Sequence, residues 1–87
     1  MLPTVHREGG FQFRIFSNDH SPPHVHAIKA GGFAKVAIGS ATDPPCLLET
    51  RSLKDRDIVR AVRVVEREWR KLMLAWTNIH GEKNTHG

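Results

Sequence analysis

The hydrophobic period of this chain changes once, near Ser52, and that change restricts the fold more than any other feature. Before it, apolar residues tend to alternate with polar ones, as in strands whose side chains point in turn to opposite faces of a sheet. After it, apolar residues recur every three or four positions, the period of an amphipathic helix. Strands followed by helix predict an α+β domain whose antiparallel sheet is covered by the helical segment.

The helical segment is expected to run from Ser52 to His80. Ser52 is the expected N-cap, with Asp55 three residues later in a capping-box-like position, and Gly81 is the expected C-terminal stop. Seven apolar residues form one stripe: Ile58, Val62, Val65, Trp69, Leu72, Trp76 and Ile79. One continuous helix would be roughly 40 Å long. That is long for so small a domain, so a long C-terminal helix and a helix pair both stay open.

The first half is expected to form a small antiparallel sheet of four to five strands. Gly9-Gly10 and Gly31-Gly32 each separate two extended runs, which predicts two hairpins because the tight turns need the positive φ that glycine adopts easily. The expected strands are residues 3–8, 11–16, 24–30 and 33–38, with residues 46–49 as a short edge strand. Residues 39–45 are rich in turn formers and are expected to connect the last two.

Three further apolar residues carry expectations of their own. Cys46 is expected to be a small buried hydrophobe. Val64 and Leu74 lie off the helical stripe and are expected to mark contacts with a partner or another element. As the one cysteine, Cys46 also excludes an internal disulfide and a multi-cysteine zinc site.

Length and charge limit the function further. The 87 residues have room for one core, so we expect a single domain over residues 1–81 and a flexible tail over residues 82–87. A core this small is consistent with a homodimer or a protein partner, and the +4 charge favours acidic partners such as nucleic acid. With no signal-peptide run and no apolar stretch of about 20 residues, we expect a cytoplasmic protein without a membrane span.

The chemically richest stretch is DHSPPHVH, residues 19–26. His24 and His26 are two apart on an extended segment, so both rings leave from one face while Val25 points to the core. The proline pair stiffens the approach and brings His20 near the start of the strand, with Asp19 beside it. Because neutral imidazole is a common ligand of divalent metals, these three histidines and the aspartate are candidate ligands for zinc or a similar ion.

Three interpretations of this stretch stay open. His20, His24 and His26 are candidate catalytic residues for acid-base or metal-dependent cleavage of a phosphodiester, with Arg14 or Lys35 holding the phosphate. A metal bound there could instead only hold the loop. In the third interpretation, which the spacing favours because it matches no specific metal motif, the cluster is structural or contacts a partner.

Arginines form a second row on the expected helix, nearly opposite the apolar stripe. They are Arg56, Arg60, Arg63, Arg67 and Arg70. Guanidinium groups bind phosphates in a bidentate manner, so this row is the candidate contact for nucleic acid or a protein partner. The alternative is a solvated helix face, because acidic residues flank the row and no aromatic platform accompanies it.

The chain resembles a known family of small bacterial proteins, the domains of unknown function numbered 4160. The resemblance is carried by LPTVHREGGFQFRIFSNDHSPPHVHA, residues 2–27, whose signature is Asp19, His20, Pro22, Pro23, His24 and His26, and by Trp76 near the end of the helical segment. It implies a compact α+β fold without an established activity. Members are often encoded beside another small protein, in pairs that look like toxin–antitoxin modules, and some are labelled transcriptional regulators; the resemblance thus implies a protein partner.

Two functions follow as expectations. The first is a non-enzymatic binding protein, one half of a toxin–antitoxin-like pair that contacts a partner protein or nucleic acid through the arginine row. The second is a small nuclease or hydrolase that uses the histidine cluster, with or without a divalent metal. The residues do not decide whether the protein is an enzyme.

Overall fold

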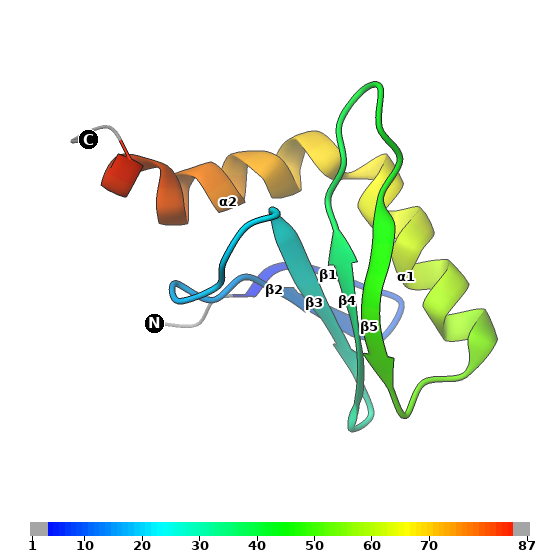
Figure 1. Ribbon diagram of the computed structural model, residues 1–87. Helices are drawn as coiled ribbons and strands as arrows, with labels where there is room; N and C mark the ends of the chain where they lie inside the picture. The colour runs from blue at the N-terminus through cyan, green and yellow to red at the C-terminus, as the bar shows by residue number, and fades with distance from the viewer. Residues whose placement is uncertain (1–3, 85–87) are drawn as a thin grey trace.

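The computed structural model describes residues 4–84 and confirms the α+β prediction. Five antiparallel strands form one sheet in the order β1-β2-β3-β4-β5, followed by two helices (Figure 1). The elements are β1 (Thr4–Glu8), β2 (Phe11–Arg14), β3 (His24–Lys29), β4 (Gly32–Ala37), β5 (Cys46–Arg51), α1 (Asp55–Arg67) and α2 (Trp69–Asn84). No helix in residues 4–84 is long and apolar enough to cross a membrane.

Both glycine pairs lie at hairpins, but the second turn is shifted by one residue from the prediction. Gly9 and Gly10 have φ values of 60° and 84°, as a tight primed turn requires. In the second hairpin the positive φ values belong to Ala30 and Gly31. Gly32 begins β4, where a Cβ would overlap the backbone carbonyl of Ser52. Close approach of two backbones is therefore why Gly32 is a glycine.

The core lies between one face of the sheet and the two helices. In Figure 1, α1 lies beside β4 and β5, while α2 runs past the end of the sheet where β3 begins. The buried apolar residues are Phe11, Phe13, Ile15, Val25, Ala27, Ala34, Val36 and Ile38 from the sheet half, with Ala61, Val64, Val65, Leu72 and Trp76 from the helices. The predicted stripe supplies only part of the helical core, because Ala61 and Val64 also face the sheet.

The helical segment is a helix pair, the second of the two predicted arrangements. Glu68 joins α1 to α2 with φ −101° and ψ 19°, outside the helical region. Its backbone N–H still donates to Val64 O at 2.8 Å, and Leu72 N–H donates to Glu68 O at 3.0 Å. The break therefore changes the helix direction with little loss of hydrogen bonding. The change of direction allows the apolar faces of both α1 and α2 to pack against a small sheet.

Both predicted helix ends are wrong. The helix begins at Asp55 after the N-cap residue Lys54, and no side chain caps it. Ser52 has a φ of 58° and belongs to the turn that leaves β5, so it cannot serve as N-cap. Gly81 does not stop the helix, since α2 continues to Asn84. Of the predicted flexible tail, residues 85–87 lie outside the described residues.

The edge strand β5 is exposed along its whole length, and the predicted burial of Cys46 is wrong. The strand is also longer than expected and reaches Arg51. Leu47 and Leu48 are 39% and 43% exposed. The apolar composition of this segment favoured burial, but β5 lies at the edge of the sheet with a neighbour on one side only.

Candidate metal centre

The β2–β3 loop folds Asp19 back onto Phe16. Phe16 N–H donates to Asp19 Oδ2 at 2.9 Å, and Asp19 N–H donates to Phe16 O at 3.0 Å. These two bonds fix the carboxylate and leave its second oxygen, Oδ1, directed toward β3. The aspartate is thus positioned by the loop backbone rather than by a helix or strand.

His24 and His26 share one side of β3, as predicted. Their ring centroids are 5.1 Å apart with an interplanar angle of 67°. Val25 points the other way and is fully buried in the core. The edge-to-face contact between the His26 and Phe16 rings, at 4.9 Å, adds a second constraint on the His26 ring.

The His24 ring has one bonded nitrogen and one buried nitrogen without a hydrogen-bond partner. Its Nδ1–H donates to Pro22 O at 2.8 Å, since a carbonyl oxygen can only accept. In the neutral ring the other nitrogen, Nε2, therefore carries a lone pair. The residue is 3% exposed, and no described residue forms a hydrogen bond with Nε2, which lies 3.5 Å from Asp19 Oδ1.

The same carboxylate oxygen lies 3.3 Å from Nε2 of His26. The three ligand atoms, Asp19 Oδ1 and one nitrogen of each histidine, all lie within 4.8 Å of one another. Tetrahedral ligands held at 2.0–2.1 Å from a zinc ion stand about 3.3 Å apart. The two oxygen–nitrogen separations, 3.3 Å to His26 and 3.5 Å to His24, are close to that spacing.

The electrostatics of Asp19 favour the carboxylate. Burial by itself would raise the pKa of Asp19, but several interactions oppose it: the Phe16 N–H bond, the His26 bond, and the charges that His26 and His24 carry when protonated. Together they leave the pKa of Asp19 below its ordinary value. The group is therefore a carboxylate at neutral pH, the form that can bind a cation.

The structure does not bring His20 into this cluster. Its side chain is exposed on the loop, at the rim of a hollow that Asp19 and His24 also line. Of the four candidates from the sequence, three converge and His20 stands apart. The proline pair places His24, through its bond to Pro22 O, rather than bringing His20 round to the strand.

Two residues of α2 pack beside the site, although no sequence pattern placed them there. The ring centroid of Trp76 lies 5.4 Å from that of His24, and His80 stacks on Trp76 at 3.9 Å and 25°. His80 Nδ1–H donates to Trp76 O at 3.2 Å. The contact between Trp76 and His80 could have been predicted from the sequence, because residues four apart on a helix lie side by side.

A family model described as a domain of unknown function (DUF4160) matches residues 10–77, well over half of the chain. The chain belongs to the DUF4160 family. The matched range of this DUF4160 member includes β2, the loop with Asp19, both cluster histidines and Trp76. No curated protein and no solved structure matches the chain.

This DUF4160 domain has a second group of metal-ligating types: His6, Glu8 and Glu68. Its members are already paired with cations. Arg67 forms ion pairs with both glutamates, and Lys71 Nζ lies 2.8 Å from His6 Nδ1. A metal there would have to displace two positive side chains, so this group is an ion-pair network between β1 and the helices.

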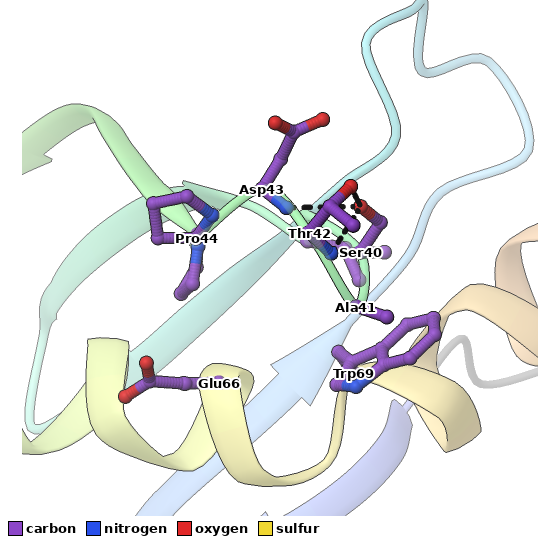
Figure 2. A pocket seen from close by; sticks show the side chains of 9 residues that line it. Ser40, Ala41, Thr42, Asp43, Pro44, Glu66 and Trp69 are labelled. Atoms are coloured by element: carbon purple, nitrogen blue, oxygen red, sulfur yellow. Dashed lines mark hydrogen bonds between the residues drawn. The ribbon is translucent and has the colours of Figure 1, made fainter.

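A hollow away from the histidine cluster carries no such chemistry. It has a volume of about 320 Å³ and lies between the β4–β5 connection on one side and Glu66 and Trp69 on the other (Figure 2). Ser40 Oγ accepts from the backbone N–H groups of Thr42 and Asp43, at 3.2 and 3.1 Å. Those contacts close a turn within the loop and direct no donor at a ligand.

All five residues of the arginine row are exposed, but they differ in their contacts. Arg67 is ion-paired with Glu8 and Glu68, and the guanidinium of Arg70 lies 5.0 Å from the centre of the Trp69 ring. The remaining three, Arg56, Arg60 and Arg63, form no ion pair with any side chain that the structure describes.

Proposed function

We propose that this protein binds a divalent metal ion, zinc or one of similar ligand preference, through Asp19, His24 and His26. The observation that carries the proposal is the buried Nε2 of His24, which has no hydrogen bond and faces a carboxylate oxygen at 3.5 Å. A neutral imidazole lone pair beside a carboxylate is unfavourable in a buried site. A shared cation converts that repulsion into coordination.

The surroundings of the ligands support the same proposal. Metal-binding histidines commonly donate their second ring N–H to a backbone carbonyl, which fixes the tautomer and the ring orientation. His24 does so toward Pro22 O, and the Phe16 N–H holds Asp19 in the same way. The ligand atoms are therefore oriented before any metal arrives, and little ordering entropy opposes binding.

A metal site with three protein ligands can be catalytic as well as structural. A fourth position open to water is the arrangement of catalytic zinc, which lowers the pKa of its bound water. We propose on this basis that the site supports metal-dependent hydrolysis, and that the neighbouring hollows admit the substrate. A protonated His24 paired with Asp19 is the competing explanation of the geometry, and metal titration separates the two.

The test is calorimetric titration of the purified protein with zinc, together with visible spectroscopy of the cobalt-loaded protein. We expect one ion per chain and the intense visible absorption of tetrahedral cobalt. Asp19→Asn and His26→Gln should each weaken binding by at least about tenfold. His20→Gln removes an imidazole from the same loop without touching the cluster and should bind zinc like the wild type. Absence of binding, or equal loss in His20→Gln, would refute the proposal.

A second candidate function rests on the three unpaired arginines of α1. We propose that Arg56, Arg60 and Arg63 contact the phosphates of a nucleic acid. They project from one exposed helix face, and the described ion pairs leave them free of acidic partners. A guanidinium that is not neutralised within the molecule can release counterions from a polyanion, which makes such binding salt-dependent.

Fluorescence anisotropy with a short DNA duplex and a short RNA tests this candidate. Affinity should fall steeply between about 50 and 200 mM salt, and Arg56→Glu, Arg60→Glu and Arg63→Glu together should flatten that dependence. The control is charge reversal at two exposed arginines on strands, Arg7 and Arg51. If both sets of variants bind alike, the α1 arginines are solvated surface.

A further inference from the structure

We infer that the metal centre takes a phosphate group, held on the side away from the ligands by Lys35 and His20. This inference rests on the proposed metal site and assigns it a ligand class. The starting observation is a hollow of about 190 Å³ whose lining includes two of the metal ligands, Asp19 and His24, together with the side chains of His20 and Lys35. The lining of this hollow therefore combines two candidate metal ligands with two further nitrogen-bearing residues.

Strand register places Lys35 beside the cluster. Arg14, His26, Lys35 and Glu49 are directly paired across β2, β3, β4 and β5, so their side chains share one face of the sheet. Although Glu49 is opposite Lys35, the two form no ion pair, and no other described carboxylate neutralises the ammonium. Lys35 as a whole residue is partly buried.

Arg14 and Lys35, the cationic residues paired with His26 on either side, have different neighbours. Arg14 is turned toward Gln12, whose Oε1 accepts from its Nε and Nη2 at 3.2 and 2.6 Å. Lys35 instead lines the hollow that contains His24. The sequence offered Arg14 or Lys35 as the phosphate-binding residue, and the structure favours Lys35.

Charge selects the ligand class. A divalent ion with one carboxylate and two neutral imidazoles has a net charge of +1, and Lys35 adds another positive charge at the hollow. A phosphate group supplies up to two negative charges and several strong acceptor oxygens, and lysine is a common phosphate-binding residue. The hollow is small, so it suits the phosphate group of an ester rather than a whole nucleotide.

The metal is required for this binding. Without it, Asp19 places a carboxylate at the edge of the hollow, where the negative charge repels an anion. A bound metal ion would compensate the carboxylate charge, and with three protein ligands it would leave a coordination position for an oxygen of the anion. Phosphate affinity should therefore depend on metal loading.

The experiment uses inorganic phosphate as the probe, titrated into the zinc-loaded protein by calorimetry. Line broadening of the phosphorus NMR signal by the cobalt-loaded protein reports whether the anion reaches the metal. We expect binding with zinc, at least tenfold weaker binding without it, and strong broadening with cobalt. Acetate, a carboxylate probe, should bind at least tenfold more weakly than phosphate.

The variants separate this inference from the metal site itself. Lys35→Gln should weaken phosphate binding by about tenfold and His20→Gln by a smaller factor, with zinc affinity unchanged in both. Arg14→Gln removes the same charge from the other side of His26 and should change phosphate affinity less than twofold. Zinc binding without phosphate binding, equal phosphate affinity in Lys35→Gln, or equal affinity for acetate would overturn the inference and leave the metal site standing. Failure to bind zinc would overturn both.

Discussion

The Nε2 atom of His24 lies 3.5 Å from Oδ1 of Asp19 and forms no hydrogen bond with any described residue. The same histidine holds Pro22 O through its other ring nitrogen at 2.8 Å. A buried polar atom without a partner costs about 1–3 kcal/mol, so its retention calls for a compensating role. The role we propose for it is coordination of a cation that Asp19 shares.

Zinc should stabilise the fold. Any ligand that binds only the folded state adds RT ln(1 + [L]/Kd), which is about 2.7 kcal/mol at 100 times Kd. We expect the melting temperature of the wild type to rise by about 10 °C or more under these conditions. His26→Gln should show little of this rise, and thermal scans with and without chelator measure it. The same rise in His26→Gln would place the ion elsewhere.

Substitution of Gly32 should destabilise the fold through backbone overlap. A Cβ at this position meets the Ser52 carbonyl, and backbone atoms cannot yield as a flexible side chain would. We expect Gly32→Ala to cost more than about 3 kcal/mol in the free energy of unfolding by urea. The matched control is Gly31→Ala, where nothing lies within 4 Å of the added Cβ and only the φ of 84° opposes the change. Its cost should be closer to about 1 kcal/mol.

Two residues off the predicted helical stripe should differ sharply. Val64 is 4% exposed and packs in the core, whereas Leu74 is 62% exposed. Val64→Ala should lower the free energy of unfolding by about 2 kcal/mol, because it removes buried methyl groups and leaves a cavity. Leu74→Ala should change it by less than about 0.5 kcal/mol. Chemical denaturation of the two variants checks the contrast, and similar losses would contradict the packing of α1.

Acid should weaken the ion-pair network of β1. The Arg67 hydrogen bond, followed by that of His6, lowers the pKa of Glu8 below its ordinary value of 4.5. A lowered pKa means that the stabilisation is present above pH 4.5 and is lost as the pH falls through the lower, folded-state value. Glu8→Gln should therefore show a smaller loss of stability between neutral pH and pH 3 than the wild type. The effect is modest because the pair is solvent-exposed.

Urea denaturation over a pH series measures the Glu8 effect. The useful control is Glu66→Gln, an exposed glutamate of α1 without an ion pair among the described side chains. This control should follow the wild-type pH dependence. Identical curves for Glu8→Gln and the wild type would show that the pair contributes nothing to acid stability.

The sequence alone determined the local features of this protein. Alternation at Phe11 and Phe13, the glycine pairs and the spacing after Ser52 predicted strands, hairpins and helix, because backbone preference and hydrophobic period act within a few residues. The same local rule placed His24 and His26 on one side of a strand. These predictions were confirmed because no distant segment had to be located to make them.

Tertiary structure decided everything that joins distant segments. Which histidines meet Asp19 depends on the closure of the loop through Phe16 and Pro22, and that closure left His20 outside. Edge position exposed Cys46, and the turn at Ser52 moved the start of α1. Composition and hydrophobic period indicate which secondary structure and which degree of burial a residue favours. The neighbours of a residue are known only from the folded structure, because the distances between side chains depend on loop geometry and on contacts between elements far apart in sequence.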